Sequence, residues 1–230
     1  ALEPGILGLL FDDMQGDRAG LARTQADIVH FVADRLPDTR LLACPTYYSL
    51  DPALKVLFGE PPRGYLEELG RFLDHSIDIL WTGPRVCSTS YPEAHLDRIA
   101  ARLGRKPFLW DNYPVNDNQP TMHLGPVVNR DADLCEVIDG YMSNAMCKQN
   151  EANRIPLLTC ADYAYNPAEY DAARSIGQAI LHLESKPASR EIIKELVEVY
   201  PGFVIFGKPR TGLNPVWEQF AKLASTPHSR

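Results

Sequence analysis

The sequence predicts an α/β fold with parallel strands, because short apolar runs alternate with amphipathic helices over its first two thirds. The first run, Ile6 to Phe11, is continuously apolar, as in a strand buried on both faces. The next segment repeats apolar residues at helical spacing from Ala22 to Leu36 and ends at Pro37. The same order then recurs, which is typical of successive βαβ units.

Four further strands follow the first in this interpretation. We expect them at residues 41–44, 77–81, 107–110 and 140–143. Amphipathic helices are expected at residues 65–73 and 96–103, with a short helix at 134–138 and another from about residue 151. A Pro- and Gly-rich loop precedes residue 65. The first two thirds of the chain therefore contain about five strands.

The chain beyond residue 166 is predicted to be helical. Its apolar residues mark helices at 176–183, 192–196 and 217–223. We therefore divide the chain into an α/β domain at residues 1–166 and a helical extension at residues 167–230.

Composition and charge exclude several classes of function. The net charge of −7 argues against a nucleic-acid partner and weakly against a polyanionic sugar polymer. There is no apolar run of 18 residues, so we expect no membrane-spanning helix, and no signal peptide is recognisable. The chain starts at Ala1 and runs almost directly into a strand, so we expect residues upstream of it.

The five cysteines indicate reduced thiols, because their number is odd and none form a CxxC pair. Closely spaced ligand pairs are also missing among the histidines, so we expect neither a metal site nor a cofactor. Unpaired thiols favour a reducing, cytoplasmic compartment. Secretion stays open, because upstream residues could include a signal peptide.

Polar side chains follow each expected strand. In chain order these are Asp12-Asp13, Pro45-Thr46-Tyr47-Tyr48, Thr82-Gly83-Pro84, Asp111-Asn112 with Asn116-Asp117, and Asn144. Ligands of parallel α/β folds bind at the C-terminal ends of the strands, so we expect one polar site there. Carboxylates, amides and aromatic rings without a basic cluster suit a neutral sugar, and paired carboxylates are the usual groups that cleave glycosidic bonds.

Each of these features also has a purely structural interpretation. Asp12 and Asp13 could cap the following helix, and Asn112 and Asn144 could form turns. Trp110 could belong to the core. The Asp-Asp pair could also bind a metal in an unrelated α/β enzyme. Only the shared placement at strand ends favours a sugar site.

Six motifs in order resemble family 84 of the glycoside hydrolases, which includes protein O-GlcNAcases and bacterial hexosaminidases sometimes called hyaluronidases. The motifs are Leu10-Phe11-Asp12-Asp13, Cys44-Pro45-Thr46-Tyr47-Tyr48, Trp81-Thr82-Gly83-Pro84, Trp110-Asp111-Asn112 with Asn116-Asp117, Leu124-Gly125-Pro126 and Ser143-Asn144. The resemblance covers about residues 5–170. It implies a (β/α)8 TIM-type barrel, of which residues 1–166 form the C-terminal portion, strands four to eight.

The resemblance further implies a β-N-acetylglucosaminidase with a retaining, substrate-assisted mechanism. The substrate's 2-acetamido oxygen attacks the anomeric carbon and gives an oxazoline, which water opens. By resemblance, Asp12 orients the acetamide group, while Asp13 protonates the leaving oxygen and later deprotonates the water. Two neighbouring carboxylates do not both ionise freely, which is consistent with two separate roles.

The resemblance also implies a set of substrate-binding residues. The acetamide group would be surrounded by Tyr48, Thr82, Trp110 and Asn112. The sugar hydroxyls would be bound by Asp117 and Asn144. The chain departs from the family at Ala145, where proline is usual, and over residues 118–122.

A full barrel has eight strands, and the resemblance implies that the first three are missing. An open sheet exposes its edges and its apolar interior. We therefore predict that an N-terminal half-barrel or another chain completes the fold. The expected partner is a glycan or glycoprotein bearing N-acetylglucosamine. The alternatives are a non-catalytic sugar-binding partial barrel and a hyaluronan-directed hexosaminidase.

Overall fold

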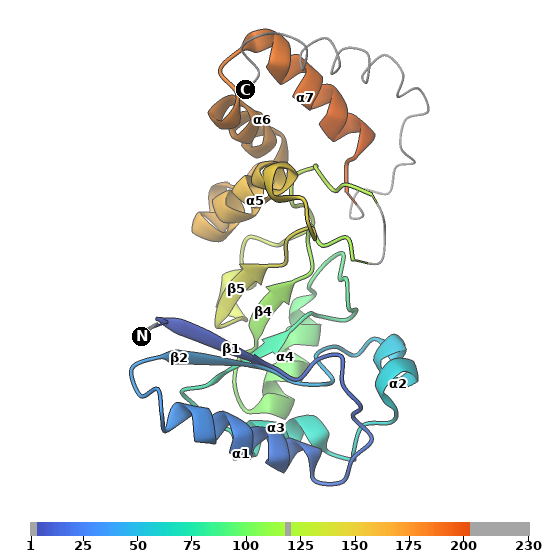
Figure 1. Ribbon diagram of the computed structural model, residues 1–230, viewed down its shortest axis with the longest axis vertical. Helices are drawn as coiled ribbons and strands as arrows, with labels where there is room; N and C mark the ends of the chain where they lie inside the picture. Colours follow the sequence, from blue (N-terminus) through green and yellow to red (C-terminus); the bar gives the residue numbers. More distant parts are fainter. Residues whose placement is uncertain (1–3, 118–120, 203–230) are drawn as a thin grey trace. The chain divides into compact units, whose positions relative to one another are not determined.

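The computed structural model describes residues 4–117 and 121–202 (Figure 1). The chain divides into two compact units. The first unit comprises residues 1–112 and 133–142, and the second comprises residues 113–132 and 143–230. No helix among the described residues has the length and apolar character that crossing a bilayer requires.

A five-stranded sheet in the order β1-β2-β3-β4-β5 organises the fold (Figure 1). The strands are β1 (Ile6–Leu10), β2 (Arg40–Cys44), β3 (Asp78–Trp81), β4 (Phe108–Asp111) and β5 (Gly140–Ser143). The pairing is parallel from β1 to β4, with Leu7 opposite Leu41 and Leu80 opposite Phe108. Each strand lies within one residue of the range predicted from the apolar runs, so the sequence-based strand prediction is confirmed.

The helices of the first unit are α1 (Leu21–Ala33), α2 (Pro52–Phe58), α3 (Tyr65–Phe72) and α4 (Glu93–Leu103), with a 3-10 turn η1 at Leu134–Glu136. Helices α1 and α3 lie along one face of β1 and β2, whereas α2 lies to one side of the strands (Figure 1). Helix α3 packs against both α1 and α4. The core lies between these helices and the two central strands, because every residue of β3 and all but the first of β2 are buried.

Helix α2 lies where the sequence analysis expected a loop. The Asp51 side chain accepts a hydrogen bond from the backbone N–H of Ala53 at 3.0 Å, and Pro52 occupies the first helical turn. Both are ordinary signals for the start of a helix. The neighbouring prolines and glycines suggested a loop, and the seven-residue helix is too short for its apolar period to stand out.

The second unit contains the helices after β5. These are α5 (Asn150–Tyr165), a 3-10 turn η2 (Pro167–Glu169), α6 (Ala172–Leu183) and α7 (Pro187–Val199). Helix α6 packs against α5 and against α7. The predicted helices from residue 151, at 176–183 and at 192–196 are therefore present, whereas the one expected at 217–223 lies outside the described residues.

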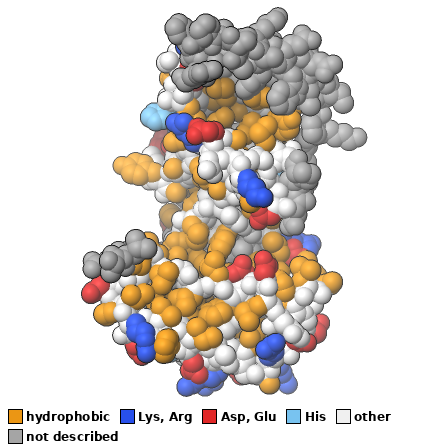
Figure 2. Space-filling view, in the orientation of Figure 1, with side chains coloured by type: hydrophobic (Ala, Val, Ile, Leu, Met, Phe, Trp, Pro, Cys, Tyr) orange, Lys and Arg blue, Asp and Glu red, His pale blue; other side chains and the backbone are white. Residues whose placement is uncertain are grey.

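The first strand of the sheet exposes one apolar face. Ile6 and Leu10 point to the same side of β1 and are 57% and 52% exposed. Ile28 and Phe31 of α1 are also exposed. On the face seen in Figure 2, hydrophobic side chains gather over the region where Figure 1 shows β1 and α1. Exposed apolar surface of this kind, next to a strand edge, can pair with another segment of chain.

Helices α3 and α4 approach closely at a glycine. A Cβ atom added at Gly70 would lie 2.1 Å from the backbone oxygen of Leu103. The same junction is held by Arg105, whose guanidinium donates to the carbonyl oxygens of Gly70 and Leu73 at 2.6 and 2.8 Å. Any side chain at position 70 must therefore push the two helices apart.

We expect Gly70→Ala to lower the free energy of unfolding by about 1–3 kcal/mol, the usual cost of overpacking. The matched control is Gly177→Ala in α6, where an added Cβ meets nothing within 4 Å. That change should stabilise the helix by roughly 0.5–1 kcal/mol. Thermal or urea denaturation measures both. Equal effects of the two substitutions would contradict the close approach.

Candidate functional site

The end of β1 carries the two predicted catalytic carboxylates, Asp12 and Asp13. The strand pairing continues past Leu10, because the backbone N–H of Phe11 donates to the oxygen of Cys44 at 2.9 Å. The hydroxyl of Thr46 donates to the Phe11 oxygen at 2.6 Å. Both polar groups of the residue before Asp12 are thus fixed, which limits where the carboxylates can lie.

A buried ring of hydrogen bonds supports this position. Tyr65 in α3 donates through its hydroxyl to the Gln25 side-chain oxygen at 2.5 Å. Gln25 in α1 donates to the Thr46 hydroxyl oxygen at 2.7 Å, and the Thr46 N–H donates to the Tyr65 hydroxyl at 3.1 Å. All three side chains are buried. Every member is partnered, and buried polar groups that are fully satisfied make an arrangement rigid.

The two carboxylates differ in backbone and in environment. Asp12 is partly buried, whereas Asp13 is exposed and has a left-handed backbone with φ of 54°. Left-handed backbone is uncommon for residues other than glycine, although aspartate tolerates it. Burial raises the pKa of Asp12 above its ordinary value; a backbone hydrogen bond opposes the shift, and the negative charge of Asp13 adds to it.

The negative charges of Asp12 and Asp13 both act on the phenol of Tyr48. Tyr48 is 8% exposed, and burial raises the pKa of its phenol, with the charges of Asp13 and Asp12 among the causes that add to the shift. Burial and the same two carboxylates raise the pKa of the Cys44 thiol. The phenol therefore keeps its proton and can donate a hydrogen bond next to the acidic pair.

The loops after β2, β3 and β4 are bonded to one another. The backbone N–H of Thr82 donates to the Tyr48 oxygen at 2.9 Å, and its buried hydroxyl donates to the Arg85 oxygen at 3.0 Å. The side-chain N–H of Asn112 donates to the Val86 oxygen at 2.7 Å. These bonds connect the loops that carry Tyr48, Thr82 and Asn112 at adjacent strand ends.

Trp110 and Asp111 end β4 and point to opposite sides of it. The Trp110 indole N–H is buried and has no hydrogen-bond acceptor among the described residues. Asp111 is fully buried and accepts hydrogen bonds from the hydroxyls of Tyr91 at 2.9 Å and Tyr141 at 2.7 Å. Asp111 was expected at the strand end without a role of its own. Because side chains alternate along a strand, Asp111 points away from the side that Trp110 and Asn112 share.

The two predicted hydroxyl ligands, Asp117 and Asn144, belong to the second unit. Asp117 is exposed in a turn after β4, and Asn144 is partly buried directly after β5. Their loops are connected, because the side-chain oxygen of Asn116 accepts a hydrogen bond from the backbone N–H of Cys147 at 3.0 Å. The other six predicted residues, Asp12, Asp13, Tyr48, Thr82, Trp110 and Asn112, all belong to the first unit.

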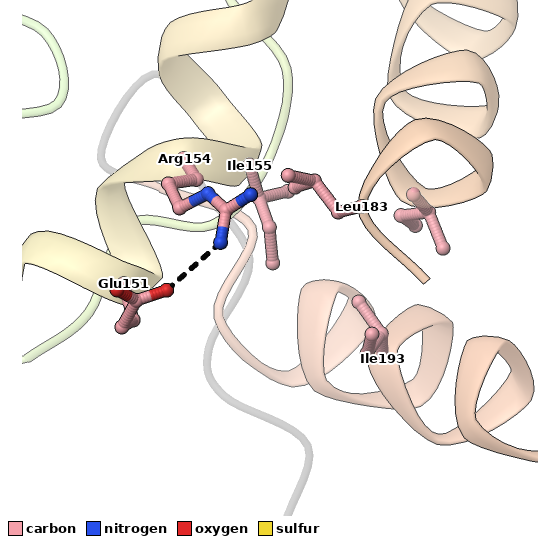
Figure 3. Close-up of a pocket in the computed structure, with 6 residues that line it drawn as sticks. Glu151, Arg154, Ile155, Leu183 and Ile193 are labelled. Atoms are coloured by element: carbon pink, nitrogen blue, oxygen red, sulfur yellow. Dashed lines mark hydrogen bonds and ion pairs between the residues drawn. The ribbon is translucent and has the colours of Figure 1, made fainter. Parts of the chain in front are cut away.

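A small cavity lies among α5, α6 and α7 in the second unit (Figure 3). Its volume is about 140 Å³, and none of the predicted site residues line it. Ile155, Leu183 and Ile193 supply apolar walls, and Glu151 and Arg154 form an ion pair at 3.0 Å beside them. The volume is below the roughly 300 Å³ at which ligand pockets usually begin. The strand ends are therefore the better candidate site.

The chain matches a family model across most of its length. The model is described as beta-N-acetylglucosaminidase and covers residues 6–198. Protein O-GlcNAcases of Rattus norvegicus and Mus musculus are each 31% identical to the chain over 166 residues. This alignment covers 67% of the chain and 18% of either relative. The chain thus spans less than a fifth of the length of these curated relatives.

Solved structures share the fold. A mutant of the Thermobaculum terrenum O-GlcNAc hydrolase matches with a TM-score of 0.75 and 31% identity, over 95% of this chain and 49% of that one. The structure of CpGH84B matches with a TM-score of 0.72 and 26% identity, over 94% and 38%. The predicted fold, part of a TIM-type barrel with five parallel strands, is confirmed by these matches and by the observed sheet.

The raised pKa of Asp12 predicts that Asp12→Asn increases the stability of the fold by an amount that depends on pH. Folding raises this pKa, so Asp12 favours the folded state at low pH and loses that contribution as pH rises through the raised pKa. Asp12→Asn should therefore melt at a higher temperature than the parent at pH 7. The gain should shrink as the pH falls towards about 3.9, the ordinary carboxyl pKa.

Thermal denaturation at a series of pH values measures this effect. The control is Asp38→Asn, at an exposed turn position, which should leave the melting temperature nearly unchanged throughout. A gain for Asp12→Asn that stays constant across the series would show that burial of the charge is not its cause.

Proposed function

Because the chain belongs to the β-N-acetylglucosaminidase family of glycoside hydrolases, we propose that it removes terminal β-linked N-acetylglucosamine. The observation that carries this proposal is the pair of adjacent carboxylates at the end of β1, with the buried Tyr48 phenol within their electrostatic range. The proposed reaction is hydrolysis with retention, in which the substrate supplies the nucleophile.

In this mechanism the two carboxylates divide the work. The acetamide oxygen attacks the anomeric carbon, and Asp12 accepts a hydrogen bond from the acetamide N–H, which stabilises the developing positive charge. Asp13 gives its proton to the departing oxygen as the glycosidic bond breaks. The intermediate is the oxazolinium ion, whose N–H stays hydrogen-bonded to Asp12. Water then attacks its anomeric carbon, the bond from that carbon to the acetamide oxygen breaks, and Asp13 takes a proton from the attacking water. The exposure of Asp13 lets it reach both the leaving group and water. In the chain without substrate the raised pKa belongs to Asp12, so this division requires the bound acetamide N–H to stabilise the Asp12 carboxylate.

The remaining predicted residues bind and orient the sugar. Tyr48 donates a hydrogen bond near the acetamide, and Asn112 binds the acetamide region. Thr82 lines that pocket with its methyl group, since its hydroxyl is bonded to the Arg85 oxygen. Trp110 forms an apolar wall of that pocket. Its indole N–H has no acceptor among the described residues, which supports a position where a polar ligand could accept the hydrogen bond.

For two residues of the second unit, Asp117 and Asn144, the proposed role is to bind sugar hydroxyls. Asp117 binds hydroxyls at C4 and C6 of the sugar, and Asn144 binds another hydroxyl. A carboxylate and an amide suit this task, since each accepts hydrogen bonds from hydroxyl groups.

The proposed substrate is a glycoprotein that carries N-acetylglucosamine. Relatives described as protein O-GlcNAcases support this class. The net charge of −7 speaks against hyaluronan, a polyanion. A purely sugar-binding role is not favoured, because both carboxylates of the acidic pair are present and the relatives are described as hydrolases.

We also propose that another segment of polypeptide pairs with β1 and covers its apolar face. The support is the exposure of Ile6 and Leu10 on the first strand of the sheet. Covering these side chains would bury apolar surface and remove an unpaired edge. The segment is either an N-terminal half-barrel or another chain.

Asp13→Asn tests the acid. In the full-length protein, we expect kcat for an aryl N-acetylglucosaminide to fall by about 10²- to 10⁴-fold. The loss should be larger for aryl groups that leave poorly, because these depend most on protonation, while a competitive inhibitor should still bind. Asp17→Asn, an exposed change in the same loop, is the control and should keep full activity. If Asp13→Asn keeps full activity, Asp13 is not the acid.

Ile6→Lys tests the cover over β1. In the 230-residue chain alone, the change should alter the free energy of unfolding by no more than about 0.5 kcal/mol, as at other exposed positions. In the form that carries the covering segment, either a longer chain or a complex with a second chain, it should destabilise the fold by several times that amount, because a buried charge is costly. Val56→Lys on α2, 85% exposed, is the control. Neutral behaviour of Ile6→Lys in the chain alone, in the longer chain and in the complex, measured by urea denaturation, would refute the cover.

A further inference from the structure

Two buried asparagines hold the loops that carry Asp117 and Asn144. Asn153 in α5 is 6% exposed, and Asn116 in the loop after β4 is 8% exposed. We propose that Asn153 and Asn116 are positioning residues that set the spacing of the two sugar-hydroxyl ligands and thereby the enzyme's discrimination between sugar epimers. This inference rests on the proposed function.

Asn153 clamps the loop that carries Asn144. Its side-chain oxygen accepts a hydrogen bond from the backbone N–H of Met146 at 2.8 Å, and its side-chain N–H donates to the Met146 oxygen at 2.8 Å. Both polar groups of one backbone residue are held by one planar amide. This arrangement fixes the direction of the chain two residues after Asn144 as well as its position.

The clamped residue is itself buried. Met146 is 3% exposed, and its sulfur accepts a hydrogen bond from the backbone N–H of His123 at 3.2 Å. The loop therefore cannot shift at Met146 without breaking buried contacts, and each unpaired buried group would cost free energy.

Asn116 joins the two loops. Its oxygen accepts from the backbone N–H of Cys147 at 3.0 Å, and its N–H donates to the Thr121 oxygen at 2.8 Å. Asp117 is the next residue in the chain. Asn144 precedes Cys147 by three residues, which limits their separation to about 11 Å. The loops that carry the two proposed sugar ligands are thus linked through one amide side chain.

This spacing matters most for sugars that differ in the direction of one hydroxyl. N-acetylglucosaminides and N-acetylgalactosaminides differ only at C4. Two ligands at a fixed separation can satisfy one arrangement of hydroxyls better than the other, because an unmatched polar group is left unpaired. Loosening either loop should therefore reduce the enzyme's preference for the N-acetylglucosaminide over the N-acetylgalactosaminide. A loss of stability elsewhere in the fold should leave that preference unchanged.

The experiment compares leucine variants of the full-length protein on the two aryl glycosides. Asn153→Leu and Asn116→Leu remove the hydrogen bonds and keep a similar volume. Each should raise KM for the N-acetylglucosaminide about tenfold, which is the effect of losing one hydrogen bond between the protein and the sugar. The change in kcat should be smaller. The ratio of kcat/KM between the glucosaminide and the galactosaminide should fall by a similar factor.

Thr159→Val is the matched control in the same helix. Thr159 is fully buried, accepts a hydrogen bond from the Val127 N–H at 3.0 Å and donates to the Pro156 oxygen at 2.7 Å. The change removes a comparable pair of buried hydrogen bonds without touching Met146 or Cys147. We expect a lower melting temperature and an unchanged ratio between the two sugars.

Asn153→Asp and Asn116→Asp serve if the leucine variants do not fold. Each keeps the acceptor for the loop N–H and loses the donated bond, so each should show an intermediate loss of preference. Soluble variants with the parent's sugar ratio would overturn the positioning role while leaving the proposed function intact. A full-length parent that neither hydrolyses nor binds N-acetylglucosaminides would overturn the proposed function, and this inference with it.

Discussion

The hydrogen-bond ring of Gln25, Thr46 and Tyr65 is the constraint on which the acidic end of β1 depends. It ties α1 and α3 to the end of β2, and Thr46 then holds the oxygen of Phe11 at the point where the strand ends. The network is buried and every member is partnered. Small displacements of either helix would therefore be transmitted to the backbone that carries the two carboxylates, which links the packing of the outer helices to the chemistry of the proposed site.

The strands were predictable because they are short and apolar, and because prolines and polar residues punctuate them. Ile6 to Phe11 is continuously apolar, and the structure pairs it with β2 residue by residue. Helix α2 was missed because its start signal, Asp51 with Pro52, lies among residues typical of loops. The helix is only seven residues long, so its apolar residues show little periodicity. The capping hydrogen bond of Asp51 and the proline in the first turn are the signals that mark its start.

The residues proposed to contact the sugar could be predicted from the sequence, whereas the residues that hold their loops in place could not. The C-terminal ends of parallel strands lie along one edge of the sheet, so the sequence alone groups Asp12, Tyr48 and Asn112. Asn116 and Asn153 could not be recognised in the same way. Their hydrogen bonds reach backbone groups up to 31 residues away, and sequence patterns do not indicate which distant backbone N–H or carbonyl a side chain contacts. The uneven burial of two adjacent aspartates likewise depends on packing.

The left-handed backbone at Asp13 narrows the paths by which this position can drift over evolutionary time. Glycine, asparagine and aspartate occupy such a conformation at small cost, whereas branched or bulky side chains are strained there. A lineage that abandons catalysis would most easily exchange this acid for asparagine or glycine, with the fold intact. Homologues carrying either residue at the equivalent position are therefore the ones to test first for binding without turnover.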